Sequence, residues 1–326
     1  MMFRSLPEIF MWTSLEICAG GGGQALGLEQ AGFRHVALVE IEPPACSTLR
    51  LNRPDWKVIE ADVRGFHPVG MGGIDLFAGG VPCPPFSKAG KQLGATDERD
   101  LFPEAVRLIG AIQPRLVMLE NVRGLLDRSF AEYRKQLDHR LKSLGYSVEW
   151  KLLQASDFAV PQLRPRVICV GIRRDLSGDF RWPVASTLFA PTVGETLVDL
   201  MAANGWTGAS DWAARADAIA PTLVGGSKKH GGPDLGPTRA KRAWAELGVD
   251  GRGLTDLAPP IDFRGMPRLT TRMAARIQGF PDSWTFFGKK TTAYRQIGNA
   301  FPPPVARAVG ASLADLLLLN SRKQAV

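Results

Sequence analysis

The chain has 326 residues, 45% of them hydrophobic, which is enough for one large domain or two moderate ones. No run approaches the roughly 18 apolar residues of a membrane span, and the N-terminus shows no basic region followed by an apolar core, so we expect a cytoplasmic protein. The net charge of +8 lies mostly in residues 191–326, which carry 17 basic against 11 acidic side chains, and this asymmetry favours a polyanionic partner.

The first 190 residues alternate short apolar segments with amphipathic ones. Strand character is found in residues 14–18, 36–39, 58–60, 74–78, 116–119 and 167–172. Helical character is found in residues 24–31, 44–52, 103–112 and 130–144. Repeated β–α units with continuously apolar strands predict a mostly parallel, doubly wound α/β sheet.

The alternation fails after about residue 190. Residues 191–267 are rich in Gly, Pro, Trp and basic residues with poor periodicity, and residues 225–233 are typical of a loop. Helical patterning returns at residues 271–278 and 304–319. We therefore predict a second, smaller and irregular domain.

The four cysteines, Cys18, Cys46, Cys83 and Cys169, are widely scattered. No two have the spacing of zinc ligands and their density is too low for a disulfide framework, so we expect no metal site and a reducing compartment. Cys83 is then available as a free thiol.

A glycine run, residues 20–23, follows the first predicted strand. Glycines there let the backbone approach a ligand at a helix N-terminus. Glu40 ends the second predicted strand, where ribose hydroxyls bind in doubly wound folds, and Asp62 follows the third, where a carboxylate can accept from an adenine amine. The combination predicts a nucleoside cofactor, with a simple tight turn as the alternative.

Cys83 lies between two prolines, shortly after the apolar strand predicted at residues 74–78. A buried structural cysteine is the alternative reading. The polar segment that follows, residues 87–94, favours a reactive thiol instead, and Lys88 and Lys91 can lower its pKa.

A carboxylate and two guanidiniums accompany later apolar segments. Glu120 ends the strand at residues 116–119, where α/β sheets place functional groups, although a helix cap is the alternative. Arg164 and Arg166, after Gln162, precede the strand at residues 167–172, and alternation places both on one face. They need an anionic or carbonyl partner, unless they form an internal ion pair.

Taken in order, these segments resemble the motifs of the DNA (cytosine-5) methyltransferases of bacterial restriction–modification type. The resemblance runs over nearly the whole chain and rests on residues 18–23 (CAGGGG), 82–87 (PCPPFS), 120–122 (ENV), 162–166 (QLRPR), 276–281 (RIQGFP) and 296–300 (QIGNA). It implies a Rossmann-like, S-adenosylmethionine-dependent methyltransferase sheet with a target-recognition domain inserted near the C-terminus.

The resemblance also implies a mechanism. Cys83 adds to C6 of a flipped cytosine, Glu120 binds N3 and the exocyclic amine, and Arg166 holds O2 with support from Arg164. C5 then takes the methyl group of S-adenosylmethionine, leaving S-adenosylhomocysteine.

The remaining site residues are carried over from the same resemblance. The cofactor pocket comprises Cys18, Gly20, Gly23, Glu40, Ile41, Asp62, Pro82, Leu101 and Asn299. Because Asn299 lies so late, the catalytic domain is expected to comprise residues 1–190 plus 291–326, with residues 191–290 forming the target-recognition domain and hinge. The predicted DNA contacts are Ser87, Thr222, Leu223, Lys228, Lys229, Arg239, Lys241 and Arg242, with a solvated loop as the alternative for the basic residues.

Four positions depart from the commonest family pattern: Cys18 replaces a phenylalanine, Ile41 an aromatic residue, Pro84 a glutamine and Met273 a glutamate. We expect apolar packing and Asp62, rather than stacking, to hold the adenine. Met273 cannot form any ion pair that the glutamate makes, and we expect this absence to affect the stability of the hinge.

The implied partner is double-stranded DNA, with a cognate restriction endonuclease acting on the same site, and the implied state is a nucleoid-associated monomer. The competing functions are a transfer-RNA cytosine methyltransferase of the same fold and a catalytically silent DNA-binding relative. Amino methyltransferases are excluded because their Asp/Asn-Pro-Pro-aromatic motif is absent.

Overall fold

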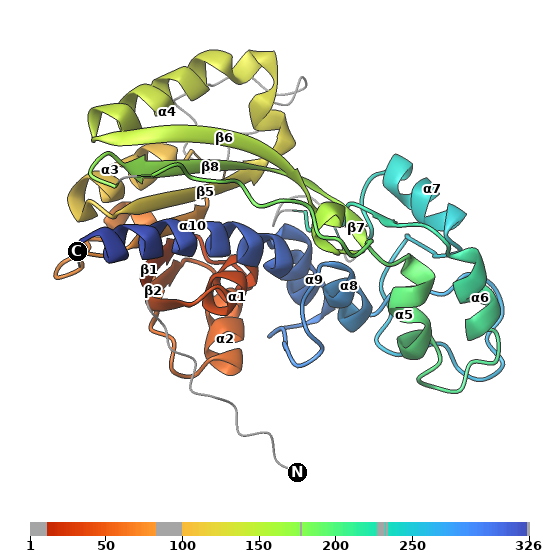
Figure 1. The fold of residues 1–326 in the computed structure, drawn as a ribbon. Coiled ribbons are helices and arrows are strands. Elements are labelled where there is room, and N and C mark those ends of the chain that lie inside the picture. The colour runs from red at the N-terminus through yellow and green to blue at the C-terminus, as the bar shows by residue number, and fades with distance from the viewer. Residues whose placement is uncertain (1–11, 83–99, 177, 227–231, 233, 325–326) are drawn as a thin grey trace, which may run out of the picture.

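A seven-stranded sheet with the strand order β3-β2-β1-β4-β5-β8-β6 organises the protein (Figure 1). The computed structural model describes residues 12–82, 100–176, 178–226, 232 and 234–324. The strands are β1 (Trp12–Ile17), β2 (Phe33–Glu40), β3 (Val58–Glu60), β4 (Leu76–Gly80), β5 (Leu116–Val122), β6 (Tyr146–Gln154) and β8 (Pro165–Arg173). Strands β1 to β5 pair in parallel, and β8 runs antiparallel to both of its neighbours. The predicted doubly wound α/β sheet is confirmed.

Helices cover both faces of this sheet. They are α1 (Gly23–Gln30), α2 (Pro43–Asn52), α3 (Phe102–Ile112), α4 (Ala131–Ser143) and α10 (Pro303–Gln324). Alternation along β4 shows the division, because Phe77 packs in the cluster of α3 and α4 while Leu76 and Ala78 pack in the cluster of α1 and α10. No helix in the described part of the chain is both long and apolar enough to cross a membrane.

The Gly- and Pro-rich segment after residue 190 contains more regular structure than its sequence suggests. It includes the helices α5 (Val193–Met201), α6 (Ala209–Arg215), α7 (Thr238–Glu246) and α8 (Thr271–Ile277), followed by α9 (Lys290–Asn299). In Figure 1, α5, α6 and α7 form a lobe beside the sheet. Buried Trp206, Trp212 and Trp244 supply the core of this lobe. A two-stranded parallel sheet, β7 (Gln162–Leu163) with β9 (Ala220–Pro221), joins the lobe to the residues before β8.

Helix α8 begins with a capping box that includes Met273. The amide of Met273 donates to the Thr270 hydroxyl at 3.2 Å, and the Thr270 amide lies 3.4 Å from the Met273 sulfur. The thioether is a weak acceptor in the place usually taken by Glu or Gln. Because the Met273 side chain is also buried, apolar packing accompanies the cap at this position.

Residues 280–288 pack against the first part of the chain. The Trp284 indole donates to the Gly21 carbonyl at 3.1 Å, and Asn52 exchanges two hydrogen bonds with the backbone of Thr285. The Arg53 guanidinium lies 5.8 Å from the ring centre of Trp56 and 5.4 Å from that of Trp284. This segment is thereby fixed to α2 and the glycine run.

The segment that begins at residue 301 lies directly on α1. A Cβ on Gly27 would lie 2.4 Å from the Pro303 carbonyl oxygen, so only glycine permits the two backbones to approach this closely. Helix α10 therefore completes the face of the sheet that the first helix begins. The end of the described chain thus packs against its first helix.

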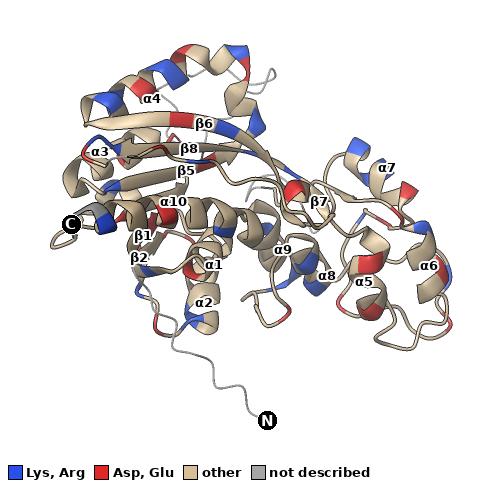
Figure 2. Ribbon diagram, viewed as in Figure 1, with Lys and Arg blue, Asp and Glu red and all other residues tan. Residues whose placement is uncertain are grey.

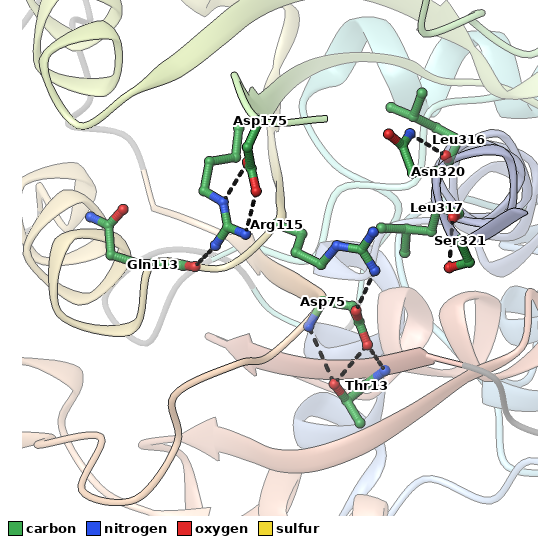
Figure 3. Close-up of polar contacts among 10 residues, drawn as sticks. Thr13, Asp75, Gln113, Arg115, Asp175, Leu316, Leu317, Asn320 and Ser321 are labelled. Carbon is green, nitrogen blue, oxygen red and sulfur yellow. Dashed lines mark hydrogen bonds and ion pairs between the residues drawn. The ribbon is translucent and has the colours of Figure 1, made fainter. Parts of the chain in front are cut away.

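A polar network holds the amino ends of the strands together (Figure 3). Asp75 accepts from the amide and hydroxyl of Thr13, and Arg115 lies 3.2 Å from the same carboxylate. Nearby, Arg173 donates to the Gln113 carbonyl at 2.5 Å and pairs with Asp175. This network lies at the opposite edge of the sheet from Glu40 and Glu120.

Candidate active site

The predicted functional residues gather at the carboxyl edge of the parallel strands. Glu40 ends β2, and Asp62 follows β3, with the Ala61 amide donating to the Glu40 carbonyl at 3.0 Å. On the other side of β1, Gly80 of β4 is paired with Glu120 of β5. Parallel strands end at one edge, so these groups share it as expected.

The glycines of residues 20–23 differ in the space available around them. Gly20 has a φ of +54°, and a Cβ at this position would meet no other atom within 4 Å. By contrast, a Cβ on Gly23 would lie 2.1 Å from the Phe301 carbonyl oxygen, and one on Gly22 would lie 2.7 Å from the Trp284 ring. Gly20 is thus free to face a ligand, whereas Gly22 and Gly23 allow the later chain segments to pack.

Glu40 is fixed by the turn that it faces. One of its carboxylate oxygens accepts from the Gly20 amide at 2.7 Å and the other from the Glu42 amide at 2.8 Å. Burial raises the pKa of Glu40, and these amide donors oppose the shift. Each oxygen retains acceptor capacity, so the carboxylate suits a pair of ribose hydroxyls.

The remaining predicted pocket residues differ in how far they are exposed to solvent. Ile41 is 55% exposed and follows Glu40 directly, and Pro82 is also exposed, whereas Leu101 is partly buried. Asp62 caps the short turn Val63–Gly65 and pairs with Arg64 at 3.0 Å. The exposed Ile41 offers the apolar surface expected for an adenine.

Two buried side chains that flank the glycine run lack hydrogen-bond partners among the described residues. Both carboxylate oxygens of Glu16 and both amide atoms of Gln24 are unsatisfied. Buried polar atoms of this kind normally have a partner. Together with the open Gly20 and the fixed Glu40, they fit a site that accepts a polar nucleoside ligand. No group of three His, Cys, Asp or Glu suited to a metal occurs in the part of the chain that the structure describes.

Cys18 is in a left-handed conformation with a φ of 53° at the start of the turn. Burial raises the pKa of its thiol, and the carboxylates of Glu40, Glu16 and Asp62 raise it further. A thiol held in its protonated form is a poor nucleophile. Cys18 is therefore not expected to present a thiolate at neutral pH.

Glu120 and Arg166 form a nearly buried ion pair, with the Arg166 Nε 2.8 Å from the Glu120 Oε1. Burial raises the pKa of Glu120, while Arg166 and then Arg164 lower it. The net shift is upward, so the carboxyl holds a proton at higher pH than an exposed glutamate. It can then both donate and accept a hydrogen bond.

The Glu120–Arg166 pair lies beside the segment that leads to Cys83. A Cβ on Gly80 would lie 3.4 Å from the Glu120 Oε2, and the Asn121 amide donates to the Val81 carbonyl at 2.8 Å. Cys83 itself lies outside the described residues, as does Ser87. Asn121 belongs to the Glu-Asn-Val motif without a predicted role, and the structure shows that it fixes the backbone two residues before Cys83.

The two predicted arginines have different partners. Whereas Arg166 pairs with Glu120, the Arg164 guanidinium donates to three backbone carbonyls, those of Leu223, Gly298 and Ala300. Asn299 lies between two of these acceptors, and its amide donates to the Gly226 carbonyl at 3.2 Å. Arg164 is thus brought near the site but directed toward the insert and the end of α9.

Residues 12–315 match the family described as C-5 cytosine-specific DNA methylase. The chain belongs to this family. It is 59% identical over 309 residues to the Type II methyltransferase M.NgoMIV of Neisseria gonorrhoeae, covering 94% of this chain and 98% of that protein. It is 60% identical over 302 residues to M.NaeI of Lentzea aerocolonigenes, covering 91% and 73% respectively.

The fold is also that of solved methyltransferase structures. A DNMT2 mutant of Spodoptera frugiperda superposes with a TM-score of 0.64 at 17% identity, over 94% of this chain and 99% of that one. The S. pombe Dnmt2 methyltransferase gives 0.61 at 18% identity, over 95% and 99%. At these identities the likeness shows the shared fold of this methylase.

The predicted DNA-contacting residues of the methylase are placed differently from one another. Leu223 is buried, with its amide donating to Gln162, and the Thr222 hydroxyl donates to the Leu163 carbonyl. Arg239 and Arg242 are exposed on α7, whose surface basic residues are visible in Figure 2. Lys241 pairs with Asp234 at 2.7 Å. Lys228 and Lys229 lie outside the described residues.

Sequence reasoning missed a second basic group on the insert. The buried carboxylate of Asp250 binds Arg252 at 2.8 Å and Arg268 at 3.0 Å, and both guanidiniums are largely exposed. Arg252 is two residues from Asp250, but Arg268 is distant and the folded loop brings it there. The short Asp-Gly-Arg segment at residues 250–252 could have indicated the pairing of Asp250 with Arg252, because it places a carboxylate beside a basic residue in a turn.

Proposed function

We propose that this methylase transfers a methyl group to C5 of a flipped cytosine in a specific duplex DNA sequence, through a covalent bond between Cys83 and C6. The observation that carries the proposal is the buried Glu120–Arg166 pair beside Gly80 at the start of the Cys83 segment. S-adenosylmethionine, bound at the glycine run, would supply an electrophilic methyl group.

The residues would act in a defined order. The Cys83 thiolate forms a bond to C6, and the ring electrons move to C5, which becomes nucleophilic. The protonated carboxyl of Glu120 donates to N3 and accepts from the exocyclic amine, which offsets charge as the sulfur adds. Arg166, oriented by Glu120, would hold O2. After C5 gains the methyl group, solvent water takes the C5 proton, the electrons of the C5–H bond form the C5–C6 double bond, and the C6–S bond breaks to release the Cys83 thiolate.

Base flipping is part of the proposal because C6 of a stacked base is inaccessible to an attacking thiolate. A base turned out of the duplex meets the edge of the sheet where Glu120 and Arg166 lie. The insert would hold the duplex through Arg239 and Arg242 on α7, together with Arg252 and Arg268. Ser87, Thr222, Leu223, Lys228, Lys229 and Lys241 remain predicted contacts.

We also propose the assignment of the two domains. Residues 1–190 and 291–326 would carry the cofactor and catalytic groups, and the insert from residue 191 would read the target. Because residues 280–288 pack on α2 and the glycine run, we place the end of the insert near Gly279 rather than at residue 290. Limited proteolysis in the presence of DNA would test this boundary.

The first experiment is transfer of a labelled methyl group from S-adenosylmethionine to duplex DNA or to transfer RNA. We expect labelled DNA and no labelled RNA, and the reverse would support the transfer-RNA alternative. Bisulfite sequencing of DNA from an expressing host then identifies the modified cytosine. No transfer to either substrate would favour the silent DNA-binding relative.

The covalent step needs its own experiment. Duplex DNA with 5-fluorocytosine at the mapped position retains fluorine where the proton must leave, so it should trap the adduct. Cys83→Ser should prevent both adduct and methyl transfer, whereas Cys46→Ser, a matched cysteine change outside the proposed machinery, should permit both. An adduct formed by Cys83→Ser would reject Cys83 as the nucleophile.

The Type II methyltransferases among the relatives suggest a restriction endonuclease that cleaves the same sequence. We propose such a partner for this chain. DNA methylated by the chain should resist an endonuclease of that specificity. We propose a monomeric state as well, which light scattering of the purified protein would test.

A further inference from the structure

Arg164 lies at a junction of three chain segments. Its side chain is 1% exposed, and its guanidinium donates to Leu223 O at 2.8 Å, Gly298 O at 2.7 Å and Ala300 O at 3.1 Å. A fourth bond, at 3.3 Å, reaches the Gln162 side chain. One side chain thereby links the strand region before β8 to the insert and to the end of α9.

The insert side of this junction is fixed at several points. Leu223 donates its amide to Gln162 at 2.9 Å while its carbonyl accepts from Arg164, so both backbone groups are used. The Thr222 hydroxyl donates to the Leu163 carbonyl at 2.5 Å. A movement of the insert at residues 222–223 therefore acts directly on Arg164.

The other side of the junction reaches the glycine run. The segment whose carbonyls accept from Arg164 continues into Phe301, whose oxygen would lie 2.1 Å from a Cβ on Gly23. Gly298 packs against the insert as well, because its Cβ would lie 2.5 Å from the Cα of Gly225. Residues 298–301 are thus held between the insert and the turn that contains Gly20.

The bonding of Arg164 differs from that of Arg166, which pairs with a carboxylate. Its hydrogen bonds within the described part of the chain go to carbonyl oxygens rather than to a carboxylate, and the nearby Glu120 is bonded by Arg166. Its buried Nε has no acceptor among the described residues. An unpaired buried donor is costly. A small shift of the surrounding segments that gave the Nε an acceptor would therefore stabilise the junction.

We propose that Arg164 is a positioning residue that couples target binding by the insert to cofactor binding at the glycine run. It acts through the backbone of Leu223 and of residues 298–300 and does not touch the reacting base. The proposal rests on the proposed function, because it takes the glycine run as the cofactor site and the insert as the reader of DNA. Coupling of this kind is reciprocal for the two ligands.

The experiment measures S-adenosylhomocysteine affinity by calorimetry, with and without the duplex mapped by bisulfite sequencing. We expect the duplex to tighten binding to the unchanged chain, and Arg164→Lys to reduce the ratio of the two Kd values at least about fivefold. A lysine keeps the charge but cannot reach three carbonyls in two directions. Arg173→Lys, at the other end of β8, is the matched control and should leave the ratio unchanged.

If Arg164 had a purely structural role, Arg164→Lys would lower thermal stability without changing the ratio of the two Kd values. An unchanged ratio in a folded Arg164→Lys protein, or no coupling in the unchanged chain, would overturn the proposal. If Arg164→Lys does not fold, Thr222→Val loosens the same junction without altering a buried charge and should also reduce the ratio. Failure of the proposed function can be told apart from failure of the coupling proposal, because in the first case the unchanged chain would transfer no methyl group to DNA.

Discussion

The guanidinium of Arg166 lies 2.8 Å from the carboxylate of Glu120, on adjacent antiparallel strands and with both side chains about nine-tenths buried. An isolated charge of either sign would be costly there, so each residue makes the other tolerable. The geometry also orients the carboxyl beside Gly80, where the chain continues toward Cys83.

We expect Glu120→Gln to lower the rate of methyl transfer by roughly 10²–10⁴-fold, because an amide cannot provide a proton to N3. The raised pKa of Glu120 favours the protonated form, and this form is lost as the pH rises through that pKa. The unchanged enzyme should therefore lose activity on the alkaline side. Single-turnover rates measured against pH should show no such decline in the variant, and an identical decline would assign it to another group.

Gly23→Ala and Gly20→Ala should separate folding from ligand binding. The first places a Cβ 2.1 Å from a backbone oxygen and should destabilise the fold by about 1–3 kcal/mol or more. The second costs only the strain of its left-handed φ, about 1 kcal/mol, but fills space beside Glu40 and should weaken S-adenosylhomocysteine binding. Thermal unfolding and calorimetry measure the two effects, and equal cofactor losses per folded molecule would contradict the distinction.

Glu16→Gln should change how stability depends on pH. Burial raises the pKa of Glu16 well above its usual value, and Glu40 adds to the shift. The unfolded chain releases this proton near pH 4.3, whereas the folded chain retains it, so the contribution is full at lower pH and declines as pH rises toward the folded pKa. The unfolding midpoint of the variant should decline less between pH 5 and 8 than that of the unchanged chain.

The exposed Glu246 on α7 provides the control for that measurement. Glu246→Gln removes the same charge from the chain without altering a buried carboxyl. It should therefore follow the unchanged protein across the pH range. If Glu16→Gln also follows it, the proton of Glu16 makes no contribution to folding.

Asp250→Asn should lower the specificity of DNA binding. Its carboxylate holds Arg252 and Arg268, and oriented guanidiniums read guanine through paired hydrogen bonds. We expect the ratio of specific to non-specific affinity to fall about tenfold, while non-specific binding is kept or strengthened because a negative charge is lost. Asp256→Asn, which removes the exposed partner of Lys290, is the matched control. An equal change in both variants would indicate a general charge effect.

Much of the sheet could be predicted from the sequence because β2, β4 and β5 contain unbroken apolar runs, at residues 36–39, 76–78 and 116–119. Strand β6 was missed, since many of its side chains are polar or exposed at the edge of the sheet. Its place depends on contacts distant in sequence, such as the bond from Trp150 to Asp138 and that from Trp182 to Glu149. The sequence of residues 146–154 alone gives no indication of those partners.

The candidate site shows the same division. Glu120 and Arg166 were each singled out from the sequence, but their pairing with each other was not predicted and depends on the meeting of two strand ends. Two acceptors of Arg164, the carbonyls of Gly298 and Ala300, and the oxygen of Phe301 that packs at Gly23 lie more than a hundred positions away. Sequence alone therefore singled out these residues but did not predict which distant segments they contact.

The contact between Gly23 and Phe301 also bears on how the protein is made. During synthesis β1 and α1 emerge long before α10, so the face that α10 covers stays exposed to water until translation is almost complete. Contacts this distant in sequence form slowly, and uncovered apolar strands invite aggregation. A truncated product that ends before residue 298 is thus expected to depend on chaperones, and the turn around Gly20 should acquire its final shape only when the later part of the chain has arrived.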